Sequence, residues 1–290
     1  MKKLLALFLV LFLLPGALAE DAPILEVHQM ALGFADGYLI RLGEVEIVVD
    51  GGNSDPTKPT DDVLRYLREA GVTALDVYIA SHWHLDHCMN MNLILEAFGD
   101  ENTQVYGVSE TVPESIFNGT VRVQIGGPVK GVYHQMKMDD VVTIGGMTFT
   151  CIGPRKVDYG GQSNVDSLNF IMEYGTRKFL FTGDFAQSGC INEEYRELCS
   201  KVDVLKFPHH GSEPYEVGNK AMKVLQPQYI LVPGVANKYK IWNDYDNVAI
   251  KLPRENIFAM ADGHVVILTD GGAYIEARVN QNPADYVPAQ

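Results

Sequence analysis

The sequence predicts an α/β (α+β) sandwich in which two packed sheets are flanked by helices. Segments with strand-like patterns are interleaved with helix-compatible segments along the 290 residues. Hydrophobic residues make up 47% of the chain, which is enough for one large core or two small ones. No linker, low-complexity tract or internal repeat divides the sequence, so we expect a single domain.

The first nineteen residues have the pattern of a secretory signal peptide. Lys2 and Lys3 precede an unbroken apolar run, and Ala17-Leu18-Ala19 matches a small-x-small cleavage site. The run is too short for a transmembrane helix, although an uncleaved anchor is the alternative interpretation. We expect cleavage near Ala19-Glu20. This assigns residues 1–19 to the signal peptide and residues 20–290 to an exported domain with no transmembrane span.

The net charge of −14 disfavours general binding to nucleic acids. It does not exclude such binding, because bound divalent cations reverse the sign of the local potential. The four cysteines are Cys88, Cys151, Cys190 and Cys199. In an exported chain they permit disulfides in three alternative pairings. For Cys88, beside the histidine motif described below, a buried thiol is preferred over a soft metal ligand.

The first half of the chain is expected to alternate between strands and helices. The predicted strands are 24–30, 37–42, 45–49, 75–80 and 103–107, and the predicted helices are 60–70 and 89–98. Gly43-Glu44 is suited to a hairpin turn, and Thr60 to a helix N-cap. Segment 109–117 is ambiguous.

The second half contains more strands, with a polar, glycine-rich loop expected over 153–166. The predicted strands are 141–144, 147–152, 167–174, 178–182, 202–207, 229–232, 257–260, 265–269 and 273–277. Helices are predicted over 191–199, 220–225 and 246–252.

The motif His82-x-His84-x-Asp86-His87 directly follows the predicted strand 75–80. His82 and His84 are two apart on an extended segment, so their rings are expected on one side. Asp86 and His87 lie on the turn into the next helix and can face the same cavity. These side chains exceed what one zinc-type ion needs from so short a segment. We interpret the motif as half of a two-metal site rather than a histidine-rich surface loop.

Three other strand ends carry side chains of the same kind. Asp50 is followed by two glycines, which allow a tight turn, and we expect its carboxylate to hold a ligand histidine in one tautomer. Asp184 follows Gly183 and can bridge two cations. The pair His209-His210 supplies the kind of ligand that the first motif lacks. No arrangement typical of a serine or cysteine nucleophile is apparent.

The order of these motifs resembles that of the metallo-β-lactamase-fold hydrolases. Within that family the sequence is most similar to the branch that contains the C-terminal domain of the competence DNA-uptake protein ComEC, and it is also similar to the pneumococcal phosphorylcholine esterase. The stretches that carry the resemblance are 38–41 with 50–52, 163–168, 204–212 and 261–264. The resemblance covers about residues 22–280 and implies a four-layer αββα sandwich of two mixed sheets.

The resemblance also implies a set of metal ligands. His82 and His84 would bind a first ion, Asp86 and His87 a second, and Asp184 would bridge them. Either His209 or His210 would complete the second site, with a slight preference for His210. Two divalent ions are expected, with zinc preferred over manganese. Supporting residues around these ligands are expected to be Asp50, Asn164, Ser167 and Ser212.

The sequence departs from the family pattern at one ligand. Many members have a further histidine between the first motif and the bridging aspartate, whereas the corresponding loop here offers Asn164 and Ser167. His134 is the only histidine in between, and we discount it because it precedes the strand 147–152. One ion is therefore expected to have fewer protein ligands and more water.

A pair of divalent ions about 3.5–4 Å apart can share one water and lower its pKa from 15.7 towards about 7. Asp86 and His210 are the predicted catalytic residues, with Asp86 orienting the water. We expect an exported metal-dependent hydrolase, most simply a phosphodiesterase or phosphoesterase acting on a small molecule or a phosphodiester. The alternatives are hydrolysis of a carboxylic substrate (a lactone, thioester or β-lactam) and a metal-stabilised surface binding protein without turnover.

Overall fold

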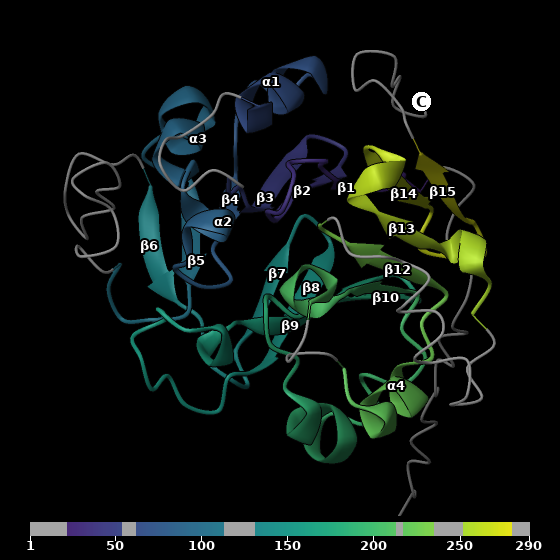
Figure 1. Cartoon of the computed structure of the whole chain (residues 1–290). Helices are drawn as coiled ribbons and strands as arrows, with labels where there is room; N and C mark the ends of the chain where they lie inside the picture. Colours follow the sequence, from purple (N-terminus) through teal and green to yellow (C-terminus); the bar gives the residue numbers. More distant parts are fainter. Residues whose placement is uncertain (1–21, 54–61, 113–130, 213–216, 235–251, 280–290) are drawn as a thin grey trace, which may run out of the picture.

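Two mixed β-sheets form the centre of the protein (Figure 1). The computed structural model describes residues 22–53, 62–112, 131–212, 217–234 and 252–279. The first sheet has eight strands in the spatial order β15 (Ile275–Val279), β14 (Val265–Thr269), β1 (Leu25–Gln29), β2 (Gly37–Leu42), β3 (Val45–Asp50), β4 (Val77–Ile79), β5 (Gln104–Gly107) and β6 (Val132–Gln135). Neighbours from β15 to β3 are antiparallel, and neighbours from β3 to β6 are parallel.

The second sheet repeats this division into an antiparallel and a parallel half. Its seven strands follow the order β13 (Ile257–Ala259), β12 (Tyr229–Val232), β11 (Val204–Lys206), β10 (Arg177–Phe181), β9 (Asn169–Tyr174), β8 (Met147–Gly153) and β7 (Val141–Ile144). Neighbours from β7 to β10 are antiparallel, and neighbours from β10 to β13 are parallel.

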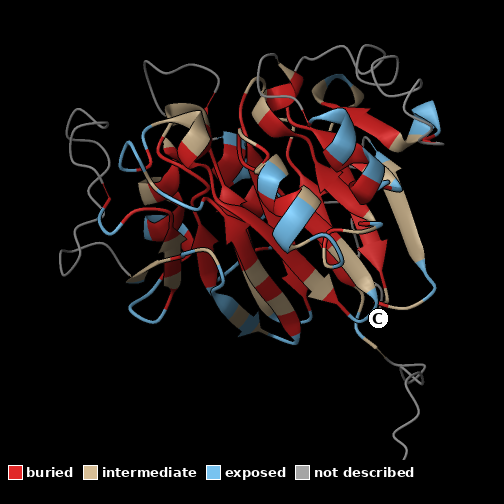
Figure 2. Ribbon diagram, turned by 90° about the horizontal axis from the view of Figure 1, so that it is seen from below, coloured by how far each residue is buried: buried red, intermediate tan, exposed pale blue. Residues whose placement is uncertain are grey.

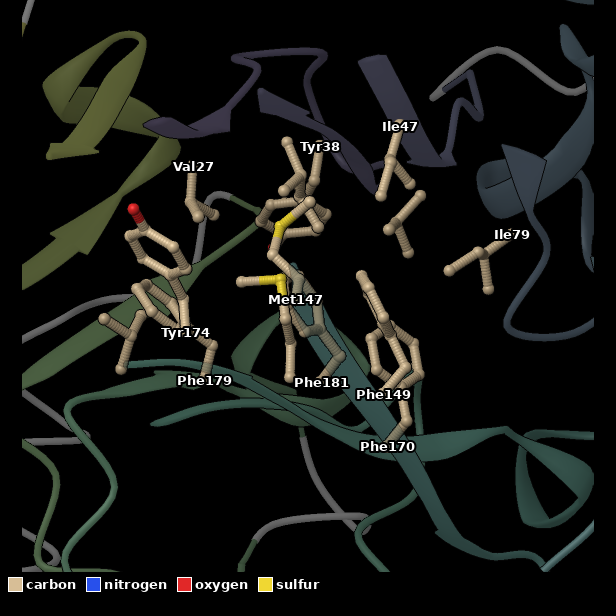
Figure 3. Close-up of a cluster of buried hydrophobic side chains, with 14 of the residues drawn as sticks. Val27, Tyr38, Ile47, Ile79, Met147, Phe149, Phe170, Tyr174, Phe179 and Phe181 are labelled. Atoms are coloured by element: carbon tan, nitrogen blue, oxygen red, sulfur yellow. The ribbon is translucent and has the colours of Figure 1, made fainter. Parts of the chain in front are cut away.

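The two sheets pack face to face through large apolar side chains. Residues of the first sheet and residues of the second point toward one another in Figure 3, and Figure 2 shows that buried residues fill the strands. Members of this cluster include Val27, Tyr38, Ile47 and Ile79 on one side and Met147, Phe149, Phe170 and Phe179 on the other. Fully burying each such side chain contributes about 1.5–3 kcal/mol, so this layer holds the sheets together.

Helices cover the outer faces of both sheets. The helices α1 (Asp62–Glu69) and α3 (Met91–Phe98) pack on the first sheet, and α4 (Asn219–Leu225) packs on the second (Figure 1). A one-turn helix, α2 (Leu85–Cys88), precedes α3. The four-layer αββα sandwich predicted from the sequence is confirmed.

Two elements differ from the sequence-based expectation. The strand β6 was not predicted, because Val132–Gln135 is only four residues long and does not alternate between apolar and polar residues. Segment 191–199 is not an α-helix: a π-helical turn spans Cys190–Glu194, in which the Tyr195 N–H donates to Cys190 O at 2.9 Å. Ile191 and Cys199 are buried as an amphipathic helix would bury them, so the apolar pattern is satisfied by a wider turn.

Some expectations fall outside the described ranges. These are the signal peptide, the N-cap predicted at Thr60, residues 113–117 of the ambiguous segment and most of the predicted helix 246–252. All four cysteines are described, and each is a buried free thiol, so none of the permitted disulfide pairings is formed. Within the described ranges, no helix is both long and apolar enough to cross a membrane.

Candidate metal centre

The site lies where the carboxyl ends of parallel strands meet. The strands β3 and β4 of the first sheet, and β10 and β11 of the second, each end at a predicted motif. Chain reversals at the ends of parallel strands point side chains out of the sheet, and ligand sites of α/β proteins occur at these ends. The packing of the two sheets therefore brings together residues from four distant segments.

Asp50, at the end of β3, anchors the histidine motif. Its carboxylate accepts hydrogen bonds from the backbone N–H and the hydroxyl of Ser81, both at 2.8 Å, and lies 3.0 Å from Nδ1 of His87. This contact directs Nε2 of His87 toward the cluster, which is the role expected for Asp50. The turn that follows needs glycine, because a Cβ on Gly52 would lie 1.8 Å from the carbonyl oxygen of Asp86.

Asp184 lies at the centre of the cluster. Its carboxylate is 3.0 Å from Nε2 of His87, 3.8 Å from Nε2 of His82 and 3.6 Å from Nε2 of His210. The backbone N–H of Asp184 donates to the Ser167 hydroxyl at 2.9 Å, which fixes the turn after β10. Ser167 thus supports Asp184 directly. Asp184 belongs to both groups of residues that could hold a metal ion.

The first of these groups contains His82, His84 and Asp184. The rings of His82 and His84 are 4.6 Å apart, on the same side of the extended segment as expected, while Trp83 between them is fully buried. Nε2 of His84 lies 3.1 Å from the carbonyl oxygen of Gln162, to which it can donate, and this leaves the lone pair of Nδ1 for the cluster. His84 is half-buried, so this part of the site opens toward solvent.

The second group contains His87, His210, Asp184 and a residue that the sequence analysis did not identify, Asp36. His210 holds its Nδ1 2.8 Å from the carbonyl oxygen of Pro233, and its Nε2 lies 3.1 Å from the Asp86 carboxylate. Asp86, which no group of potential ligands includes, is therefore placed beside the second group, with its side chain 30% exposed.

Of the two neighbouring histidines, the structure brings only His210 into the cluster. Both have a left-handed backbone, with φ of 48° at His209 and 53° at His210. Such conformations cost on the order of 1–3 kcal/mol each in non-glycine residues, and they tend to occur at functional sites. The turn points His209 toward the carbonyl oxygen of Ser212, 3.2 Å from its Nδ1. Ser212 therefore contacts His209 rather than a ligand in the cluster.

The glycine-rich loop is held by Asp166, which the sequence analysis also did not identify. This buried carboxylate accepts the backbone N–H groups of Asp158, Tyr159 and Gly161, each at 2.9 Å. Asn164 lies in a turn of this loop, and its buried Oδ1 makes no hydrogen bond to any described residue. His134 lies on β6 and forms a hydrogen bond with Gln104 at 2.7 Å, and neither group of potential ligands includes it.

Asp36 and Lys206 are the other residues that sequence reasoning missed. Both are almost fully buried and form an ion pair between the loop before β2 and the end of β11. Asp36 lies 3.0 Å from Nδ1 of His210. The available signals were weak: an Asp-Gly step at the start of a predicted strand, and a single lysine in an apolar strand.

The cluster concentrates negative charge, which shifts the ionisation of its histidines. Burial opposes a positive charge on His210, but the carboxylates of Asp36 and Asp86 outweigh it and raise its pKa to about 9. Burial also opposes ionisation of His87, yet Asp184, Asp36 and Asp50 hold its pKa well above the usual value. Burial, reinforced by the neighbouring His87, keeps the pKa of His82 well below the usual value. A cation is therefore favoured at the centre.

The donor atoms fit a divalent metal ion. Nε2 of His82, Nε2 of His87 and both carboxylate oxygens of Asp184 are buried. Within the described ranges no hydrogen bond of normal geometry satisfies them, although Nε2 of His87 lies 3.0 Å from Asp184. Buried polar atoms are normally satisfied, and imidazole nitrogens with carboxylate oxygens are the ligands of zinc and similar ions. Without a metal ion, the neighbouring carboxylates favour protonation of these imidazoles. A bound metal ion would take the place of those protons.

Comparison with known families agrees with this geometry. Residues 47–231 match the model of the beta-lactamase superfamily domain. The chain belongs to this superfamily. It is accordingly a metal-dependent hydrolase, and the expected resemblance is confirmed.

One relative supports the similarity to the competence-protein branch of the superfamily. ComE operon protein 3 of Bacillus subtilis (strain 168) is 24% identical over 249 residues, which cover 79% of this chain and 30% of that protein. The chain thus spans less than a third of that relative's length, and the match fits the competence-protein branch.

Two solved structures share the fold at low identity. The metallo-beta-lactamase fold protein YhfI from Bacillus subtilis has a TM-score of 0.57 and 13% identity, over 88% of this chain and all of that one. A diphosphatase of the PhnP family has a TM-score of 0.50 and 13% identity, over 81% and 94% of the two chains.

Proposed function

We propose that the chain is an exported hydrolase with a two-ion site, and that it cleaves phosphodiesters. The observation that carries the proposal is that two groups of potential ligands share one buried carboxylate, Asp184. Two ions bridged in this way could act on the same substrate atom. The signal-peptide pattern over residues 1–19 supports export.

The ligands are assigned from the atoms that face the cluster. His82, His84 and Asp184 would hold one ion, and His87, His210 and Asp184 would hold the other, with Asp86 beside His210. When bound, such ions act as Lewis acids on a phosphoryl oxygen and lower the pKa of a water molecule. Asp50 and the Pro233 carbonyl fix the nitrogens that His87 and His210 offer.

Asp86 is the group best placed to position a reacting water. It is the most accessible carboxylate in contact with the cluster, with its side chain 30% exposed, whereas Asp184 and Asp50 are buried. Its Oδ2 lies 3.1 Å from Nε2 of His210, which limits rotation of the carboxylate. A carboxylate held there can accept a proton from a water molecule at the solvent-facing side of the site.

The charge of the site favours a monoanionic substrate. Four carboxylates (Asp36, Asp50, Asp86 and Asp184) face one ammonium, that of Lys206, which leaves three negative charges when the imidazoles are neutral. Two divalent ions would change this to one positive charge, and a phosphodiester carries one negative charge. The similarity in fold to a diphosphatase of the PhnP family points in the same direction. A lactone, thioester or β-lactam ring gains less from this field.

The test is hydrolysis of bis-p-nitrophenyl phosphate by a protein comprising residues 20–290, with zinc or with manganese. The control is the double variant His84→Ala, Asp184→Ala. Turnover that the control loses supports the proposal. Turnover only on lactone, thioester or β-lactam panels would establish the alternative chemistry. Two bound ions without turnover on any panel would indicate a binding protein.

A further inference from the structure

The ammonium group of Lys206 is enclosed beside the cluster. Its side chain is 2% exposed, and Nζ forms a close ion pair with Oδ2 of Asp36. It also donates to the carbonyl oxygen of Gly183 at 2.5 Å and lies 3.8 Å from Oδ1 of Asp184. One positive charge, at the end of β11, therefore contacts the loop before β2 and two neighbouring residues after the end of β10.

Asp36 occupies the opposite side of the imidazoles from the substrate-facing atoms. Its carboxylate is 3.0 Å from Nδ1 of His210 and 3.6 Å from Nδ1 of His87. The Nε2 atoms of the same two rings face Asp86 and Asp184. Although Asp36 is close enough to the ligands to be counted among them, it lies behind the rings, where the Lys206 ammonium already neutralises it.

We propose that Lys206 is a built-in cation that keeps Asp36 out of the metal ligand set and positions Asp184, His87 and His210 for the second ion. This inference rests on the proposed metal site. Burying an ion pair costs several kcal/mol per charge in desolvation, and such pairs are weak contributors to stability. The pair contacts the bridging carboxylate and two ligand histidines. A role in positioning these ligands therefore explains the pair better than a contribution to stability does.

Removing Lys206 should affect the binding of the two ions unequally. Without Lys206, the buried carboxylate of Asp36 loses its ammonium partner and keeps its contacts with His210 and His87, and one edge of Asp184 loses an ammonium 3.8 Å away. His82 and His84 contact neither Asp36 nor Lys206 in the described ranges. Residues that orient metal ligands typically change metal affinity by 10–100-fold when removed. Lys206→Met should therefore weaken the second equivalent of metal by that factor and leave the first nearly unchanged.

The experiment measures zinc binding to the full-length mature protein by chelator competition, with bound metal counted by mass spectrometry. The variants are Lys206→Met, Asp36→Asn and the double variant. Lys223→Met, on the exposed face of α4, is the matched control and should bind zinc as the wild type does. The effects of the two single variants should be less than additive, because the residues act as a pair.

Several outcomes would overturn the inference. Unchanged affinity for both equivalents in Lys206→Met would show that the lysine has no positioning role. Tighter binding would show that its ammonium competes with the second ion. If Lys206→Met does not fold, the double variant, which removes both opposite charges, decides: wild-type affinity there would overturn the inference. A wild-type protein that binds no metal would instead overturn the proposed function itself.

Discussion

The carboxylate of Asp50 lies 3.0 Å from Nδ1 of His87, and this contact determines which nitrogen of the imidazole faces Asp184. The same carboxylate accepts two hydrogen bonds from Ser81, the residue that precedes the histidine motif. One side chain at the end of β3 therefore fixes both the path of the motif after β4 and the tautomer of His87, a potential metal ligand within it.

Asp50→Asn should weaken metal binding by about 10–100-fold, because an amide cannot accept from Ser81 and stabilise the His87 tautomer at once. Isothermal titration with zinc measures the change. Asp62→Asn, at an exposed carboxylate paired with Arg65 on α1, is the control and should have no effect. Wild-type affinity in Asp50→Asn would contradict this account of the His87 tautomer.

The motif at His82–His87 was predictable because its geometry is local. Alternation along an extended segment puts His82 and His84 on one side, and the structure confirms that their rings are neighbours. The same rule cannot separate His209 from His210. Both residues have a positive φ in a tight turn, so neither helical nor strand periodicity applies to them.

The Asp36–Lys206 pair could not be predicted, since it is made by the tertiary structure. Neither residue belongs to a spaced motif. They meet because the loop before β2 belongs to the first sheet, β11 belongs to the second, and the sheets pack together. A single lysine in an apolar strand indicates a buried partner, but the sequence does not identify which carboxylate that is.

His210→Ala and His209→Ala should have very different effects. His210 contacts Asp184 and Asp86, whereas His209 points to the carbonyl oxygen of Ser212. We expect His210→Ala to lose one of two bound metal equivalents and to lower kcat by at least about 100-fold, consistent with loss of a positioned metal. His209→Ala should keep both metal equivalents. The reverse order of effects would assign the ligand role to His209 and contradict the geometry.

Gly52→Ala should disrupt the site through the backbone rather than through chemistry. An added Cβ would lie 1.8 Å from the carbonyl oxygen of Asp86 and 2.4 Å from the backbone nitrogen of His87, so the two turns would have to separate. We expect loss of metal binding together with destabilisation of more than about 3 kcal/mol, in the range of severe steric substitutions. Urea denaturation measures the latter. Gly189→Ala, where an added Cβ meets no atom within 4 Å, is the matched control.

Removing metal should lower the thermal stability of the protein. A ligand that binds only the folded state stabilises it by about 4 kcal/mol at a thousandfold excess over Kd. At about 2–4 °C per kcal/mol for a domain near this size, EDTA should lower Tm by roughly 10 °C. In the described ranges the buried Nε2 atoms of His82 and His87 and the carboxylate of Asp184 make no hydrogen bond of normal geometry. Chelation therefore leaves these atoms poorly satisfied, with the 3.0 Å contact between His87 and Asp184 remaining. Asp184→Asn should remove most of the difference between the EDTA-treated and zinc-loaded protein. An equal EDTA effect in that variant would place the stabilising metal elsewhere.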